Sequence, residues 1–364
     1  MRTGTVTSVK ESRPGLLELA VDVEGAPARA LAYPDLCGPV TEGDRVLLNT
    51  TAVHLGLGTG GFHLVIAVAG ASDTDTGTEG HVMKLRYTPL QAAVRTVEEQ
   101  SSPHHDLMAA ARSLDGIPVV WVPLHSMIAP AVAGARASGA ERVAYVMTDG
   151  AALPLALSDQ VHALRSAGLL EAVITAGQAL GGDLEAVTVF SALLAARAVA
   201  GAEVIVVADG PGKVGTATPW GATDVASGMS LNAAAILGGR AVAALRVSFA
   251  DPAYRHHGVS PHSLTVLREV AVMPVHVAVP ILEGEQRQAV WSALREAKLE
   301  ERHQVVEASG APALDLLREA GLSVESMGRS MEEDPALFLG AGAAGVLAGR
   351  MAAGSARWRK GAGR

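Results

Sequence analysis

One loop of this chain concentrates side chains that could transfer protons or bind a metal ion. Residues 251–263 contain Arg255 and three of the twelve histidines, which are His256, His257 and His262. Imidazole is suited to acid–base chemistry near neutral pH, and it is a common ligand of zinc. The loop therefore predicts that these histidines act as acids, bases or metal ligands and that Arg255 binds an anion. A surface loop with satisfied histidines and a contact between subunits are the competing interpretations.

The position of His262 follows from the two residues before it. Ser260 can cap the free amides of a first helical turn, and Pro261 fits the first helical position. His262 is therefore expected in the first turn of a helix, where the positive end of the dipole favours an uncharged imidazole.

Two carboxylates follow apolar runs of the kind that form buried parallel strands. Asp149 follows residues 142–147, and Asp209 follows residues 203–208. Ligands of parallel sheets bind beyond the carboxyl ends of the strands, so both carboxylates are expected at one ligand site. There they could transfer protons or bind a divalent cation, and Asp209 with His257 is the predicted metal pair. Each carboxylate alone is also a common turn residue.

Glycine-bearing turns follow the apolar runs 171–175 and 203–208, and glycine allows a ligand to approach the backbone closely. The residues of these turns that we expect to bind the ligand are Gly177, Gln178, Gly181, Gly182, Asp183, Gly210, Gly212, Lys213 and Thr216. The amides of the second turn, with Lys213, would form a cradle for an anion. A tight loop without a ligand is the competing interpretation. Asp183 is also expected to cap a helix over residues 184–199.

Residues 210–215 place three glycines after a strand, as dinucleotide-binding loops do. However, Pro219 lies where the phosphate-binding helix would already run, and no acid follows at the distance that a ribose requires. The Gly-Lys-Ser/Thr sequence of a P-loop is also missing. An NAD or ATP motif is therefore not supported, and a divalent metal is the cofactor that the candidate residues suggest.

Ser126 follows the apolar run 117–122 and is a further candidate ligand-binding residue. A distant histidine such as His257 could serve it as a base. No Gly-x-Ser-x-Gly motif surrounds Ser126, which argues against a serine hydrolase. Capping of a helix is the competing role.

The elements that must position these residues alternate regularly after residue 81. Short apolar runs separated by amphipathic segments predict a doubly wound, mostly parallel α/β sheet of about seven or eight strands, and a β/α barrel is the alternative. The expected strands are 81–87, 117–122, 142–147, 172–175, 204–208, 241–249, 275–279 and 304–308. A buried helix is expected over residues 335–351.

The N-terminal part has a different pattern. Residues 1–70 predict a small all-β barrel with strands near 4–10, 16–23, 28–33, 44–50 and 62–68. Residues 71–80 are small and polar and predict a linker, so that the α/β domain spans residues 81–354 and residues 355–364 form a basic flexible tail.

Composition excludes some functions. The net charge of −8 argues against a nucleic-acid partner for the bulk of the chain. Cys37 is the single cysteine, which excludes an intrachain disulfide and fits a reducing compartment. The first residues lack the apolar core of a signal peptide, and the apolar stretch at 336–349 is too short to span a bilayer. These features predict a cytoplasmic protein without a membrane partner. Arginine outnumbers lysine 24 to 5, which is typical of GC-rich bacterial genomes.

Several stretches resemble a bacterial family known as domain of unknown function 3866. They are Leu48-Asn49-Thr50-Thr51-Ala52-Val53, Leu55-Gly56-Leu57-Gly58-Thr59-Gly60-Gly61, Lys84-Leu85-Arg86-Tyr87-Thr88-Pro89-Leu90-Gln91, Tyr145-Val146-Met147-Thr148-Asp149-Gly150-Ala151-Ala152-Leu153-Pro154, Gly177-Gln178, Asp183-Leu184-Glu185-Ala186, Gly210-Pro211-Gly212 and Arg255-His256-His257-Gly258-Val259-Ser260. The resemblance runs from the barrel to about Pro280. It implies no activity, substrate or catalytic residue.

The preferred hypothesis is an enzyme of the hydrolase or lyase class that acts on a small polar or anionic metabolite, with assistance from a metal. Asp149, Asp209 and the histidines would be catalytic, and the turns would hold the ligand. The alternative is a non-catalytic ligand-binding or regulatory protein whose barrel is an interaction module. A homo-oligomer with the histidine loop at its interface is a third hypothesis.

Overall fold

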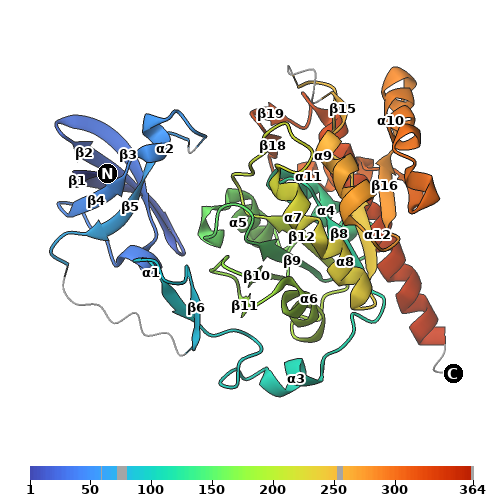
Figure 1. Cartoon of the computed structure of the whole chain (residues 1–364), viewed down its shortest axis with the longest axis horizontal. Coiled ribbons are helices and arrows are strands. Elements are labelled where there is room, and N and C mark those ends of the chain that lie inside the picture. Colours follow the sequence, from blue (N-terminus) through green and yellow to red (C-terminus); the bar gives the residue numbers. More distant parts are fainter. Residues whose placement is uncertain (59, 72–79, 252–256, 362–364) are drawn as a thin grey trace. The chain divides into compact units, whose positions relative to one another are not determined.

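A computed structural model describes residues 1–58, 60–71, 80–251 and 257–361 (Figure 1). The chain divides into two compact units, Met1–Ser101 and Ser102–Arg364.

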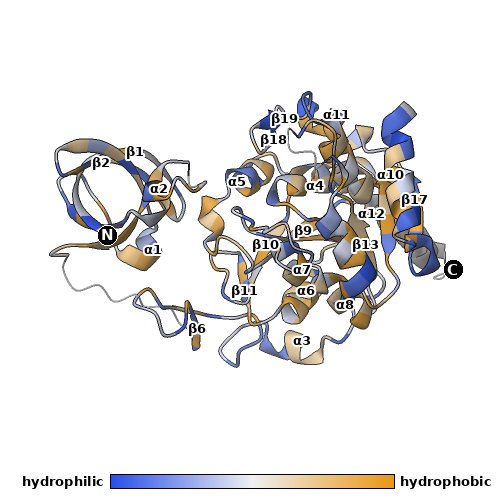
Figure 2. Ribbon diagram, turned by 45° about the horizontal axis from the view of Figure 1, so that its top comes forward, coloured by the Kyte–Doolittle hydropathy of each residue, from blue (hydrophilic) through white to orange (hydrophobic). Residues whose placement is uncertain are grey.

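The first unit contains a closed five-stranded barrel, which confirms the predicted fold of this part (Figure 2). Its strands are β1 (Arg2–Arg13), β2 (Leu16–Val23), β3 (Ala26–Ala32), β4 (Arg45–Asn49) and β5 (Phe62–Val68). Alternate residues point inward, so Leu19, Val21, Val46 and Leu48 form an apolar core. The strand order is β1-β2-β3-β5-β4, with β3 and β5 parallel and a short helix, α1 (Pro34–Cys37), before β4. This arrangement is that of OB folds.

The first unit also contains three short elements outside the barrel strands. A helix, α2 (Thr51–His54), precedes β5, and β6 (Val82–Lys84) pairs with β7 (Ala92–Val94) in a separate antiparallel sheet. The strand predicted at 81–87 therefore exists in part, but it does not join the large sheet. The turn over residues 85–91 reverses the chain, so β6 finds its partner locally.

The second unit is built on an open sheet of eight strands, and every pair of neighbours is parallel. The order is β11-β10-β9-β12-β8-β13-β16-β17, and two edges remain, so the α/β prediction is confirmed and the β/α barrel alternative is wrong. The strands are β8 (Pro118–Trp121), β9 (Val143–Thr148), β10 (Ala172–Ala176), β11 (Leu184–Ala186), β12 (Val204–Asp209), β13 (Arg240–Ala244), β16 (His276–Pro280) and β17 (Gln304–Ala308).

Helices cover both faces of this sheet, which explains why its central strands are continuous apolar runs (Figures 1 and 2). One face is covered by α4 (Ile128–Ala137), α5 (Asp159–Ser166), α11 (Ala311–Glu319) and α12 (Pro335–Gly361), and the other by α6 (Val189–Ala198), α7 (Thr223–Ser227) and α8 (Met229–Ile236). The remaining helices are α3 (His105–Ala110), α9 (Pro261–Thr265) and α10 (Gly284–Glu296), and a π-helical turn, Val266–Val270, follows α9.

Helix α12 is the buried helix that was predicted over residues 335–351, and it continues to Gly361. By length and composition Pro335–Gly354 could cross a membrane, but 67% of its most apolar window is buried within the unit. It crosses α4 at very short distance, because a Cβ at Gly345 would lie 2.0 Å from the carbonyl oxygen of Ala131. We therefore describe α12 as a core helix.

The helix predicted over residues 184–199 begins later than expected. Leu184–Ala186 forms the edge strand β11, and α6 starts at Val189 with Thr188 as its N-cap. The predicted cap, Asp183, accepts a hydrogen bond from the amide of Val173 at 2.8 Å. The prediction was wrong because pairing with β10 extends the chain for three residues before the helix can form.

Two small hairpins lie beyond the sheet. The strands β14 (Val247–Ser248) and β15 (Gly258–Val259) pair after β13, so the strand predicted at 241–249 is broken in two. The strands β18 (Glu325–Ser326) and β19 (Arg329–Ser330) pair before α12. The turn between β18 and β19 consists of Met327 and Gly328, both with positive φ, as in a two-residue hairpin turn.

Candidate functional site

A pocket of about 940 Å³ opens at the carboxyl ends of the central strands of the second unit. Its walls come from the loops after β8, β12 and β13 and from the residues before α5, and the start of α9 and the β18–β19 hairpin complete it. In the sheet, β8 lies between β12 and β13, so the chain passes over β8 on its way from β12 to β13. Such points, where the direction of winding changes, are where parallel sheets bind ligands.

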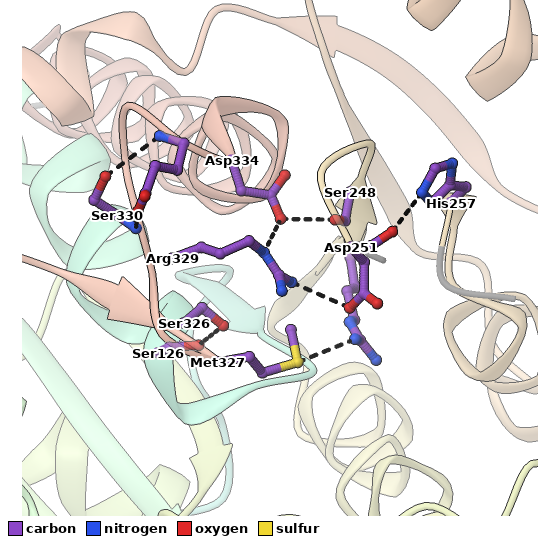
Figure 3. Close-up of polar contacts among 11 residues, drawn as sticks. Ser126, Ser248, Asp251, His257, Ser326, Met327, Arg329, Ser330 and Asp334 are labelled. Atoms are coloured by element: carbon purple, nitrogen blue, oxygen red, sulfur yellow. Dashed lines mark hydrogen bonds and ion pairs between the residues drawn. The ribbon is translucent and has the colours of Figure 1, made fainter. Parts of the chain in front are cut away.

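Some residues that the sequence singled out line this pocket. They are Ser126, Gly212, Lys213, Thr216 and His262. His262 lies in the first turn of α9, as predicted, and its Nε2 is 3.1 Å from the carbonyl oxygen of Thr218, to which it donates. Ser126 donates through Oγ to the hydroxyl of Ser326 at 2.8 Å, which joins the loop after β8 to the β18–β19 hairpin (Figure 3).

A buried group of charges lies at the inner end of the loop after β12. Asp209, the last residue of β12, is 6% exposed, and Asp224 in α7 is 1% exposed. Lys213, which lies between these two residues in the sequence, lines the pocket. It forms an ion pair with Asp224, and its Nζ donates to the carbonyl oxygen of Pro123 at 2.5 Å. The structure thus supplies two carboxylates and one amine where the sequence had indicated only Asp209 and Lys213.

The two carboxylate oxygens of Asp209 have different surroundings. One oxygen of Asp209 accepts hydrogen bonds from Thr148 Oγ1 at 2.7 Å and from the amide of Gly150 at 3.1 Å. The other, Oδ2, is buried and has no hydrogen-bond partner. Burial raises the pKa of Asp209, although the hydrogen bond from Thr148 lowers it in part. Asp209 is therefore a carboxyl group with enhanced affinity for a proton.

The surroundings of Lys213 shift its pKa in opposite directions. Burial lowers its pKa from the ordinary value of 10.5 to about 7, and the positive charge of Arg246 acts in the same direction. The carboxylate of Asp209 opposes this change. Asp224 in direct contact opposes it as well, because a neighbouring negative charge favours the ammonium form. The pKa of Lys213 is therefore lowered, and it depends on the protonation of its two carboxylate neighbours.

Arg246 is a cation of the pocket that no sequence motif had indicated. It follows β13, it is half-buried, and it lines the pocket. Among the residues that the structure describes it forms no ion pair, and its Nη2 contacts the thioether sulfur of Met327 at 3.6 Å. A thioether is a weak acceptor, and the described residues give this guanidinium no other hydrogen bond, although the charges of Asp251 and Asp334 also act on it. Burial lowers the pKa of Arg246, but arginine remains charged at neutral pH.

The backbone of the loop after β12 offers further donors. The amides of Gly212, Lys213, Val214 and Gly215 have no hydrogen-bond partner in the described part of the chain. Gly212 has a φ of 91°, a conformation that allows successive amides to point toward one side of the chain. The loop is thus suited to an anion, without any requirement for the dinucleotide fingerprint.

His125 and Ser158 form a second polar pair on the pocket wall, which the sequence had not indicated. His125 Nε2 is 2.7 Å from Ser158 Oγ, and His125 Nδ1 is 3.1 Å from the carbonyl oxygen of Asp209. A carbonyl only accepts, so Nδ1 carries the hydrogen and Nε2 accepts from the serine hydroxyl. Ser158 Oγ also accepts from the amide of Val161 as the N-cap of α5. Burial lowers the pKa of His125 to about 4, so the imidazole is neutral at physiological pH.

The predicted residues after β9 and β10 lie together, outside the pocket lining. Asp149 Oδ2 accepts from the amide of Gln178 at 2.8 Å, and a Cβ at Gly177 would lie 2.2 Å from the same oxygen. The amide of Gly181 donates to Glu185 at 2.7 Å. These glycines allow carboxylates of the chain to approach the backbone, which accounts for them without a ligand.

The other predicted turn residues have similar contacts within the chain. Gly182 donates to Thr175 Oγ1 at 3.1 Å, and Asp183 forms an ion pair with Arg165 at 2.7 Å. A Cβ at Gly210 would lie 2.3 Å from the carbonyl oxygen of Ala152, so the loops after β9 and β12 pack against each other there. The predicted set therefore separates into a pocket group and a group nearer the β11 edge of the sheet.

His257 is not among the residues that line the pocket, and it belongs to another group of polar contacts (Figure 3). Its Nε2 contacts the carbonyl oxygen of Asp251, whose carboxylate pairs with Arg329 at 3.1 Å. Arg329 also pairs with Asp334 at 3.2 Å, and Asp334 accepts from Ser248 at 2.6 Å. This network ties the loop after β14 to the β18–β19 hairpin and to the start of α12.

The predicted metal pair has no support from the described part of the chain. Asp209 and His257 have separate hydrogen-bond partners, and the described residues include no group of three His, Cys, Asp or Glu side chains that could hold a metal ion. Arg255 and His256, which were predicted to bind an anion and to be catalytic, lie outside the described residues.

The comparisons with known proteins identify the family but no activity. The family described as "Protein of unknown function (DUF3866)" matches residues 29–345, which cover most of the chain. The chain therefore belongs to this family, as the resemblance of its motifs indicated. No curated protein matches the chain.

Proposed function

We propose that this member of the DUF3866 family binds a small metabolite with an anionic group in the pocket beside β8 and β12 and acts on it as an enzyme of the hydrolase or lyase class. The observation that carries the proposal is the combination of Arg246, which has no ion pair among the described residues, with the buried group of Asp209, Lys213 and Asp224. Arg246 can bind the negative charge of the ligand, and the buried group contains side chains that can exchange a proton with it.

Recognition of an anion is supported by two kinds of donor. Arg246 lines the pocket and presents a planar guanidinium that matches carboxylate or phosphate. The amides of Gly212–Gly215 add neutral donors. A hydrogen bond to a charged group stabilises by about 1.5–3 kcal/mol, so loss of Arg246 would weaken binding by roughly 10- to 100-fold.

A catalytic role is supported by the burial of charged groups, because burial of a charge lowers the stability of the fold. Asp209 and Asp224 are almost fully buried near Lys213, whose side chain is 15% exposed, and buried charges are destabilising unless their geometry is well satisfied. Asp209 nevertheless retains an oxygen without a hydrogen bond. Carboxyl groups and amines with shifted pKa in a cleft are typical of sites that transfer protons. Metal assistance is not part of this proposal, because the described residues include no group of three His, Cys, Asp or Glu side chains that could hold a metal ion.

A non-catalytic ligand-binding or regulatory protein is the second candidate. One observation favours it: the barrel exposes Leu55 and Leu57, with 61% and 58% of their surface accessible, in the segment after α2. Exposed apolar side chains of this kind are suited to a protein contact. This candidate predicts that a bound anion changes the association of the barrel with a partner and is recovered unchanged.

The proposal places the protein in the cytoplasm, with a small molecule as its partner. A single cysteine fits a reducing compartment, and the net charge of −8 disfavours nucleic acid. Helix α12 packs as a core helix, so no membrane partner is proposed. A homo-oligomer is compatible with every contact described above.

The test is anion binding by the full chain and by matched variants. Inorganic phosphate, pyrophosphate, pyruvate, citrate and glyceraldehyde 3-phosphate would be titrated while thermal unfolding is followed. We expect at least one anion to raise the melting temperature of the natural protein, and Arg246→Gln to remove that increase. Arg268→Gln changes an exposed arginine and should leave the increase in place. An equal increase in both variants, or in neither the natural protein nor the variants, would refute the proposed site.

A further inference from the structure

We infer that Lys213 is the nucleophile of this pocket and forms an imine with the carbonyl carbon of an anionic aldehyde or ketone. The inference rests on the proposed function, because it takes the pocket as the ligand site. It adds the covalent chemistry and the class of substrate.

The position of the amine is the first step of the argument. The chain has five lysines, and Lys213 is the one that lines the pocket. Its side chain is only 15% exposed, and Nζ is held by the carbonyl oxygen of Pro123 and by Asp224. A lysine used only for a surface ion pair needs neither this burial nor a place on a pocket wall. Buried lysines with lowered pKa are the ones that serve as bases and as imine-forming nucleophiles.

The neighbours of Lys213 supply the acid that imine formation requires. Asp209 has a raised pKa and one buried oxygen without a hydrogen bond, so it holds a proton more readily than an exposed aspartate does. When Asp209 holds a proton, it no longer stabilises the ammonium form of Lys213. Asp209 and Lys213 can therefore share one proton and leave the amine with its lone pair free, a state that the charge of Arg246 favours and the charge of Asp224 opposes.

The chemistry balances with the groups present. The lone pair of the neutral amine forms a C–N bond to the carbonyl carbon, and one proton moves from nitrogen to the former carbonyl oxygen. A second proton, from Asp209, allows that oxygen to leave as water, and the product is a protonated imine. Hydrolysis of the imine returns the proton and consumes the water, so no oxidant, reductant or cofactor is required. The positive imine withdraws electrons from a neighbouring C–C or C–H bond, which is the chemistry of a lyase.

Arg246 defines the substrate class. Its guanidinium lines the same pocket as Lys213, and its charge is close enough to lower the pKa of that lysine. A substrate that reaches both groups carries a carboxylate or phosphate a few bonds from its carbonyl. The pocket volume of about 940 Å³ is at the upper end for small-molecule sites, so it admits more than the smallest oxo acid.

The experiment is reductive trapping on the full chain. Sodium borohydride reduces an imine to a stable amine, so the protein would be treated with glyoxylate, pyruvate or glyceraldehyde 3-phosphate in its presence. Mass spectrometry of peptides would then locate the adduct. We expect one adduct on Lys213, formed at least about tenfold faster than any adduct on Lys298, since an amine of lower pKa is more often neutral at pH 7.5. Equal labelling of several lysines would overturn the inference.

Two variants separate covalent chemistry from a structural role. Lys213→Arg keeps the cation opposite Asp224 but forms no imine, so trapping should disappear while the protein stays folded; Lys298→Arg is the matched control. Should Lys213→Arg fail to fold, peptide mapping of the natural protein decides the question alone. Arg246→Gln should slow trapping of pyruvate about tenfold and slow trapping of neutral propanal less, because propanal loses only the effect of the Arg246 charge on the amine and not a hydrogen bond to its own anionic group.

The outcomes distinguish this inference from the proposed function. Anions that raise the melting temperature through Arg246 but give no adduct on Lys213 would overturn the imine and leave the binding site standing. Lys213 would then serve only to hold the loop after β12 to α7. No adduct and no Arg246-dependent stabilisation would overturn both.

Discussion

The partly buried imidazole of His125 gives a prediction whose size follows from the structure. Burial lowers its pKa from 6.5 to about 4, and the hydrogen bond to the carbonyl oxygen of Asp209 raises it only in part. Between these two values the unfolded chain binds a proton at this site and the folded chain does not. The stability of the folded state therefore falls as pH falls from about 6.5 to about 4.

The magnitude follows from proton linkage. Since one pKa unit is worth about 1.36 kcal/mol, the difference between 6.5 and about 4 corresponds to roughly 3 kcal/mol when the pH is below both values. At pH 5 the loss relative to pH 7 is about 2 kcal/mol. His125→Gln removes the titrating group and keeps an amide that can both donate and accept. The variant should lack this component of acid sensitivity, whatever its stability at pH 7.

Urea unfolding at pH 7, 6, 5 and 4.5 would measure the effect. The four tryptophans all lie beyond residue 101, so their fluorescence reports on the second unit. Other groups contribute to acid unfolding in both proteins, and the difference between natural protein and variant isolates His125. His162→Gln, on the exposed side of α5, controls for removal of an imidazole in general. The reasoning is refuted if His125→Gln and the natural protein lose the same free energy between pH 7 and pH 5.

Two further predictions concern packing and the network around the hairpin. Gly345→Val should destabilise the second unit by about 1–3 kcal/mol, because a Cβ there would lie 2.0 Å from a backbone oxygen of α4, whereas Gly354→Ala, with open space around it, should be nearly neutral in thermal unfolding. Arg329→Gln removes the cation that pairs with two buried carboxylates, Asp251 and Asp334, and should cost about 3–5 kcal/mol; hydrogen exchange should rise first in the β18–β19 hairpin, and unchanged exchange there would contradict the role assigned to this arginine.

The fold was largely predictable from the sequence because its strands are unusually distinct. The apolar runs at 142–147, 172–175 and 204–208 match β9, β10 and β12 closely, since strands buried on both faces leave no polar interruptions. The errors occur where pairing overrides propensity. Residues 184–186 have helical neighbours but pair with β10, and residues 81–87 read as a sheet strand but fold back on β7.

The candidate site was predictable only in part. The turn after β12 and the start of α9 were expected, and both line the pocket. The pairing of His125 with Ser158 was not, because it joins residues 33 positions apart whose contact depends on the winding of the sheet. Arg246 could have been recognised from the sequence, because it is a charged residue inside the apolar segment 241–249. Burial of a guanidinium lowers the free energy of unfolding, so such a residue suggests a functional role. Nothing in the sequence indicated that Asp224 would pair with Lys213.

The most direct test of the central claim is a crystal structure of the full chain grown with sodium tungstate. Tungstate resembles phosphate in charge and shape, and its anomalous scattering locates it without ambiguity. We predict a tungstate within hydrogen-bond distance of the Arg246 guanidinium and the amides of Gly212–Gly215, and its loss in Arg246→Gln. Tungstate bound only elsewhere, with this pocket empty at saturating concentration, would contradict the account.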